Sequence, residues 1–161
     1  MKTAKYFIEK LGLQTHPEGG FYKETYRAKE EVENEHGNKR NLTTAIYFLL
    51  ENDNKSHFHK IKSDELWFHQ FGATLEILYI EKDELKTIYL GNDVENGEVL
   101  QATIPANTWF ASRMKNYESF GLVSCTVSPG FDFADFEMAK KQELIKTHPQ
   151  LSAVLEEMCL D

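Results

Sequence analysis

The stretch SHFHKIKSDELWFH, residues 56–69, contains two strand-like runs separated by a short polar turn. Successive side chains of a strand point to opposite faces, so His57 and His59 are expected to share one face. Glu65 and Trp67 share a face of the second run for the same reason. If the runs form a hairpin centred near residue 62, His59 lies opposite Glu65, and two imidazoles and a carboxylate converge. A slip of one residue would scatter these groups.

Short runs and turn signals alternate on both sides of this stretch. The spacing predicts strands over residues 21–27, 42–50, 56–61, 65–71, 74–81, 85–90, 99–104, 109–113 and 121–127. Strands at even spacing without long helices between them indicate an antiparallel sandwich or barrel rather than a parallel α/β sheet. The charged, turn-rich residues 29–41 predict a flexible loop. Helices are expected at the two ends, over residues 4–11 and over residues 136–160 with a break at Pro149.

Length and composition fit one globular unit. The chain has 161 residues, of which 41% are hydrophobic, and this predicts a single domain over residues 1–161. The formal net charge of −8 argues against a nucleic-acid partner and against an anionic membrane surface. No apolar run is long enough for a membrane span. Cys125 and Cys159 are expected to be reduced thiols, which predicts a cytoplasmic protein.

Two histidines and a carboxylate on neighbouring strands allow three interpretations. A set made of His57, His59 and Glu65 suits one divalent iron, manganese, nickel or zinc ion. The same groups could provide a general base and the carboxylate that orients it. In the third interpretation, the histidines are hydrogen-bonded strand residues that line no site.

Five further segments resemble motifs of a known family. The His-x-His and Glu spacing is similar to the first motif of the cupin superfamily, with one residue more than usual between the second His and Glu. One uncharacterised cupin family resembles the chain along nearly its whole length, and its motifs match HPEGGFYKETYR (16–27), TTAIYFLL (43–50), SDELWF (63–68), IPANTWF (104–110) and TVSPGFDF (126–133).

This resemblance implies an all-β fold, an RmlC-like jelly roll or double-stranded β-helix with short terminal helices. It also implies a homodimer and a pocket inside the barrel for a small polar or carbohydrate-like molecule. In an epimerase- or isomerase-like enzyme, His59 would remove a proton next to a carbonyl, and His57 or Glu65 would set its basicity. A tyrosine, Tyr47 or Tyr79, would protonate the opposite face.

Two alternatives to proton transfer stay open. In a metal-dependent enzyme, His57, His59 and Glu65 would be the ligands. The position of the usual fourth cupin ligand falls at Phe110, which cannot coordinate a metal, and His69 is a further candidate. In a non-catalytic binding module, an aromatic-rich cradle would hold the ligand; its candidate residues are Trp67, His69, Trp109, Phe110 and Phe131.

Overall fold

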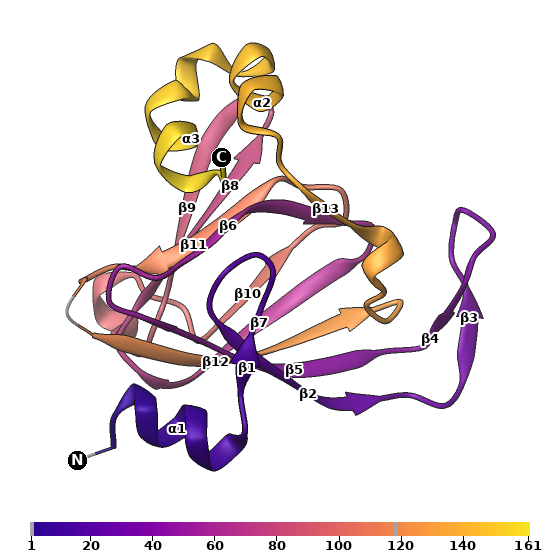
Figure 1. Cartoon of the computed structure of the whole chain (residues 1–161), viewed down its shortest axis with the longest axis horizontal. Coiled ribbons are helices and arrows are strands. Elements are labelled where there is room, and N and C mark those ends of the chain that lie inside the picture. The colour runs from indigo at the N-terminus through magenta and orange to yellow at the C-terminus, as the bar shows by residue number, and fades with distance from the viewer. Residues whose placement is uncertain (1, 118) are drawn as a thin grey trace.

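Two antiparallel sheets face each other in the computed structural model, which describes residues 2–117 and 119–161 (Figure 1). The six-stranded sheet has the order β1-β2-β5-β12-β7-β10, and its strands span Gln14–Thr15, Phe21–Arg27, Thr44–Glu51, Phe120–Ser128, Asp64–Gly72 and Gln101–Ile104. The five-stranded sheet has the order β13-β6-β11-β8-β9, spanning Phe136–Met138, Lys55–Ile61, Phe110–Met114, Leu75–Glu81 and Glu84–Leu90. The strand alternation of the sequence therefore predicts the architecture well.

Helices cover the outer faces of both sheets. Helix α1 (Ala4–Leu11) begins where Thr3 accepts a hydrogen bond from the Tyr6 N–H and ends at Gly12, which has a φ of 66°. At the other end of the chain lie α2 (Lys141–Thr147) and α3 (Ser152–Met158), joined by the 3₁₀ turn η3 (Pro149–Leu151). Two more 3₁₀ turns are η1 (Val94–Asn96) and η2 (Phe133–Asp135). In the described ranges, no helix has the length and apolarity to cross a membrane.

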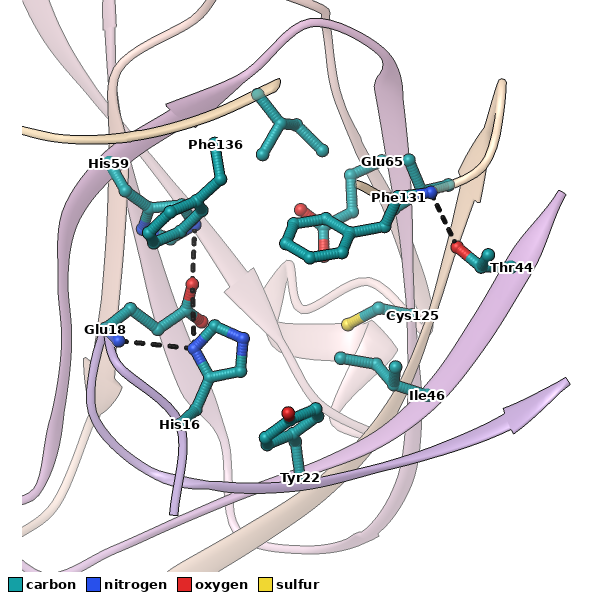
Figure 2. Close-up of a pocket in the computed structure, with 12 residues that line it drawn as sticks. His16, Glu18, Tyr22, Thr44, Ile46, His59, Glu65, Cys125, Phe131 and Phe136 are labelled. Carbon is teal, nitrogen blue, oxygen red and sulfur yellow. Dashed lines mark hydrogen bonds and ion pairs between the residues drawn. The ribbon is translucent and has the colours of Figure 1, made fainter. Parts of the chain in front are cut away.

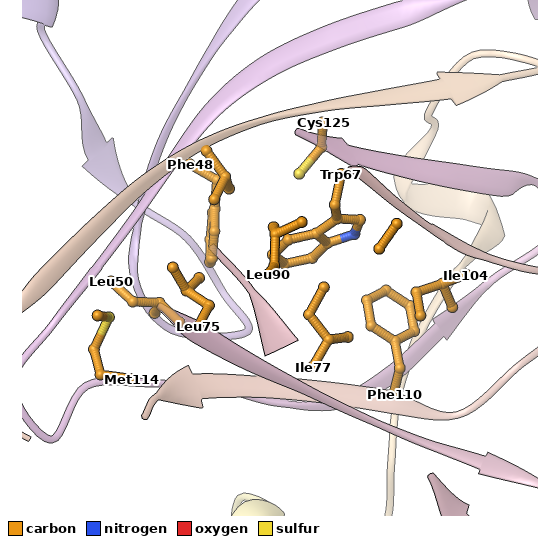
Figure 3. Packing of buried hydrophobic residues seen from close by; sticks show 12 residues of the cluster. Phe48, Leu50, Trp67, Leu75, Ile77, Leu90, Ile104, Phe110, Met114 and Cys125 are labelled. Carbon is orange, nitrogen blue, oxygen red and sulfur yellow. The ribbon is translucent and has the colours of Figure 1, made fainter. Parts of the chain in front are cut away.

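Three apolar clusters hold these layers together. The central cluster fills the space between the sheets, with Phe48, Trp67 and Phe110 among its fully buried members (Figure 3). A second cluster joins the outer face of the five-stranded sheet to α2 and α3 through Phe58 and Leu155. A third packs α1 on the six-stranded sheet. Large aromatic side chains bury the most apolar area, so they account for much of the stability of the core.

The expected hairpin between residues 56–61 and 65–71 is wrong. Strand β6 pairs with β11 and β13, whereas β7 pairs with β12 and β10 in the opposite sheet. The connection at residues 62–63 carries the chain from one sheet to the other. His59 and Glu65 therefore approach each other across the sandwich rather than along a ladder.

Two predicted segments differ in detail. Residues 29–41 contain a small hairpin of β3 (Glu31–Glu33) and β4 (Lys39–Asn41) that projects from the sandwich in Figure 1. Residues 136–138 form strand β13 on the edge of the five-stranded sheet, and the helix begins only at residue 141. An edge strand this short carries no periodicity long enough to separate it from the helix that follows.

Candidate functional site

A cavity of about 40 Å³ lies between the two sheets, beneath the segment that follows β12 (Figure 2). This volume holds two or three water molecules. Ionisable groups are gathered in the cavity wall, and aliphatic and aromatic side chains complete it. The lining residues are His16, Glu18, Tyr22, Thr44, Ile46, His59, Ile61, Glu65, Cys125, Val127, Phe131 and Phe136.

The turn between β1 and β2 brings the first two ionisable groups into the wall. The His16 N–H donates to the Gly20 carbonyl, and the Gly19 N–H donates to the His16 carbonyl. Gly19 has a φ of +107°, and a Cβ there would lie 1.9 Å from the Lys55 carbonyl oxygen. Only glycine fits this close approach. The turn therefore lies against β6 and directs Glu18 inward.

Glu18 is the centre of a buried polar network. Its Oε2 atom lies 2.9 Å from Nε2 of His59, and its Oε1 atom accepts a hydrogen bond of 3.0 Å from the Ser56 hydroxyl. Burial alone would raise the pKa of Glu18, but the charge and hydrogen bond of His59 outweigh it and lower the pKa. Glu18 is therefore a carboxylate at neutral pH.

His59 uses both ring nitrogens. A carbonyl oxygen can only accept, so Nδ1 donates to the His57 carbonyl at 2.7 Å. Nε2 faces the Glu18 carboxylate and donates to it. Burial lowers the pKa of His59, but Glu18 and the hydrogen bond between them raise it further, and the net direction is upward. The pair is therefore an imidazolium–carboxylate ion pair inside the protein.

The protonation state of the His16 ring differs from that of the His59 ring. Its Nδ1 atom accepts a hydrogen bond of 3.2 Å from the Glu18 N–H, so the ring proton lies on Nε2. Burial lowers the pKa of His16, only partly offset by Glu18. The ring is therefore neutral. Figure 2 shows its second nitrogen directed into the cavity, where it can donate to a bound oxygen.

Glu65 supplies the second carboxyl group of the cavity. Burial, followed by the nearby Glu18 carboxylate, raises its pKa to about 7, although His59 acts in the opposite direction. In the part of the chain that the structure describes, no ion pair reaches Glu65, whereas Glu18 is bound to His59. Glu65 can therefore give or accept a proton near neutral pH.

A bulge in β6 separates His57 from His59. Phe110 of β11 is opposite His59 and Ser112 is opposite Ser56, so two residues of β6, His57 and Phe58, face the single residue between them. Such a bulge redirects side chains. His59 and Ser56 both face Glu18, whereas the His57 ring bonds to the main chain of Glu18 and does not line the cavity.

The remaining predicted residues lie in several environments. Phe131 lines the cavity. The ring centroids of Phe110 and His59 are 4.2 Å apart. Trp67 and Tyr79 belong to the central apolar cluster and its margin, while Tyr47 packs beneath α1 on the outer face. Trp109 and His69 also lie away from the cavity. Trp109 is on the outer face under Lys60, and the buried Nε2 atom of His69 has no hydrogen-bond partner among residues 2–117 and 119–161.

Sequence reasoning missed His16, Glu18 and Tyr22. The first two lie in a Pro- and Gly-containing turn, which is typical of a connection. The signal that could have found them is the two consecutive glycines after Glu18, since close backbone approach often accompanies such residues. Tyr22 lies in the predicted strand over residues 21–27 and Cys125 in the one over residues 121–127, but strand alternation alone does not indicate that they line a cavity.

The three groups predicted as metal ligands do not form a metal site. Nδ1 of His57 is hydrogen-bonded to the Glu18 carbonyl, and both ring nitrogens of His59 are engaged. Across residues 2–117 and 119–161, no three His, Cys, Asp or Glu side chains converge as metal ligands do. These three residues therefore do not provide the divalent metal site that their pattern in the sequence suggests.

The sequence matches one protein family and is similar to a yeast protein. Residues 5–139 match the family described as "Cupin superfamily (DUF985)". The uncharacterized protein YML079W of Saccharomyces cerevisiae is 34% identical over 148 residues, which cover 83% of this chain and 74% of the yeast protein.

Two solved structures share almost the whole fold. A hypothetical protein from Leishmania major is 38% identical with a TM-score of 0.94, covering 99% of this chain and 100% of the other. Protein SO0799 from Shewanella oneidensis is 39% identical with a TM-score of 0.91, covering 99% of each chain. The fold of the described chain thus recurs over almost its whole length in both similar proteins.

Proposed function

The chain belongs to the cupin superfamily family DUF985, and we propose that it binds a small polar molecule between its sheets and transfers a proton on it. Epimerases and isomerases carry out this type of reaction. The observation that carries the proposal is a carboxyl group, Glu65, whose pKa is raised to about 7 in the same cavity as the His59–Glu18 ion pair. A proton-transfer group works best when its pKa lies near the working pH.

The base and the proton donor are assigned from the cavity side chains that are not already occupied by an ion pair. Both nitrogens of His59 are occupied, so Glu65, rather than His59, is the base that removes a proton next to a carbonyl. Tyr22 lines the cavity from β2, and strands β5 and β12 separate it from Glu65 on β7. In Figure 2 the two residues approach the cavity from opposite sides. Tyr22, rather than Tyr47 or Tyr79, is therefore the proton donor to the opposite face.

The ligand is a molecule rich in oxygen acceptors. His16 offers the N–H of Nε2, Tyr22 offers a hydroxyl, and the Thr44 hydroxyl can donate because it already accepts from the Phe131 N–H. These donors suit a carbonyl or carboxyl oxygen, and the N–H of His16 would stabilise the negative charge that forms on it. Glu65 takes the proton, and the Tyr22 hydroxyl returns one to carbon.

Size restricts the ligand further. About 40 Å³ accepts only a few non-hydrogen atoms. A carbohydrate-like ligand therefore requires the covering segment, residues 130–136, to move away from the cavity. A small hydroxyaldehyde or oxo acid needs less displacement.

Proton exchange with solvent tests the proposal directly. A panel of small hydroxyaldehydes, ketoses and 2-oxo acids is incubated in D₂O with the protein, and NMR follows deuterium at the carbon next to the carbonyl. We expect exchange on at least one compound, and its loss in Glu65→Gln. Glu81→Gln, at an exposed strand end, is the matched control and should exchange normally.

A binding module is the second candidate, favoured by the apolar part of the cavity wall. A compound that raises the melting temperature but never exchanges or converts would support it and would contradict the enzyme proposal.

We also propose a cytoplasmic homodimer. The family resemblance supports the dimer, and two free, buried cysteines support a reducing compartment. Light scattering that detects only monomer at micromolar concentration would contradict the dimer.

A further inference from the structure

The third histidine near the cavity contacts both members of the buried ion pair without lining the cavity. His57 hydrogen-bonds to the main chain of Glu18 and, through its own carbonyl, to the ring of His59. We propose that His57 is a positioning residue that fixes the orientation of Glu18 and His59 relative to each other. This inference rests on the proposed function, in which that pair shapes the electrostatics of the cavity.

His57 makes two hydrogen bonds to Glu18, and both end at the Glu18 carbonyl oxygen. The main-chain N–H of His57 donates to the Glu18 carbonyl oxygen at 2.7 Å, and the Nδ1–H donates to the same oxygen at 2.8 Å. A carbonyl oxygen has two lone pairs, and both are therefore used. Gly19 packs closely against this ring, since a Cβ there would be 3.3 Å from Nδ1 of His57. The turn cannot shift without breaking these contacts.

The contact with His59 fixes the orientation of its ring. The His57 carbonyl accepts the Nδ1–H of His59 at 2.7 Å, which leaves Nε2 to face Glu18. An imidazole orientation set through its second nitrogen is a common way to align a functional histidine. The bulge of β6 makes the arrangement possible, because it turns the His57 side chain from the cavity toward the turn.

A pair of nearly isosteric variants separates positioning from packing. In His57→Asn, the amide nitrogen lies close to where Nδ1 was and can still donate to Glu18. In His57→Leu, a side chain of similar shape has no donor. Histidines labelled with ¹⁵N then report the titration and the ring-nitrogen shifts of His59 in the ligand-free protein.

We expect His57→Leu to lower the pKa of His59 toward its ordinary value, because only the main-chain N–H of residue 57 then holds the Glu18 carbonyl, and the carboxylate is less firmly held against His59. His57→Asn should keep the wild-type titration. If an exchanging compound has been found, kcat should fall about tenfold in His57→Leu and much less in His57→Asn, as when an orienting hydrogen bond is lost.

A His59 titration and ring shifts that are unchanged in His57→Leu would overturn the inference, even if the melting temperature falls. Should His57→Leu fail to fold, His57→Gln replaces it, because its longer amide does not place a donor at the Nδ1 position. The NMR readout needs no ligand, so it decides the role of His57 whether or not the protein catalyses proton transfer.

Discussion

Nε2 of His59 lies 2.9 Å from Oε2 of Glu18, and both side chains are buried between the sheets. The two residues come from different parts of the chain, one from strand β6 and the other from the turn before β2. A buried ion pair is kept only where further hydrogen bonds satisfy its members, and here Ser56 and the His57 carbonyl do so. The pair therefore links the first turn of the sandwich to the opposite sheet.

Glu18→Gln should destabilise the fold strongly. It removes the negative partner and leaves His59 buried without its counter-charge, which typically costs about 3–5 kcal/mol. The pKa of His59 should fall as well. Urea unfolding and a histidine NMR titration measure the two effects. Ser56→Ala, which removes only one hydrogen bond to Glu18, is the control. An equal loss of unfolding free energy in the two variants would contradict a stabilising ion pair between Glu18 and His59.

Stability should decline between about pH 4.5 and pH 7 because of Glu65. Its pKa rises from 4.5 to about 7 on folding, so the folded state holds the proton more tightly than the unfolded state. The stabilisation is fully present below pH 4.5 and is lost as the pH rises through 7, by about 3 kcal/mol in total. Urea midpoints measured across this range should therefore change less in Glu65→Gln than in the wild type.

Asp135→Asn should loosen the segment that covers the cavity. Arg40 binds Asp135 through two hydrogen bonds, of 2.6 and 2.9 Å, and Asp135 lies directly before Phe136. In a Cys159→Ser background, a small thiol reagent should modify Cys125 severalfold faster once this pair is broken. Glu76→Gln breaks the Arg113–Glu76 pair away from the cavity and serves as the control. Equal acceleration by both variants would show general unfolding instead.

Gly19→Ala should disrupt the turn that carries His16 and Glu18. The new Cβ would collide with the Lys55 carbonyl in addition to straining a φ of +107°. Gly97→Ala is a matched control, because its φ is +87° but nothing lies within 4 Å of the added carbon. We expect a loss of about 1 kcal/mol at Gly97 and a clearly larger loss at Gly19. Chemical denaturation compares the two, and similar losses would exclude a special role for the close approach.

Strand alternation predicts the architecture, because period-2 patterns record which face of each strand is buried. Strand β2, for example, lies over the predicted residues 21–27. The pairing of β6 and β7 could not be predicted in the same way. A short polar connection is equally compatible with a hairpin and with a crossing to the other sheet, and only long-range packing decides between them.

The candidate site was predictable only in part. His59, Glu65 and Phe131 line the cavity because each faces the interior from a strand or from the segment after β12. His57 does not, because a one-residue bulge in β6 breaks the alternation on which its prediction depended. Glu18 could not be predicted from periodicity, since it lies in a turn whose path is set by contact with a strand far along the chain.

The cavity combines residues from the first turn with a cover from the segment that follows β12. During translation, the polar groups at positions 16 and 18 leave the ribosome long before Phe131 and Phe136 do. A nascent chain released before that point would carry unprotected ionisable groups and no enclosed volume. The wall of the cavity is therefore completed only after Phe136 has been synthesised.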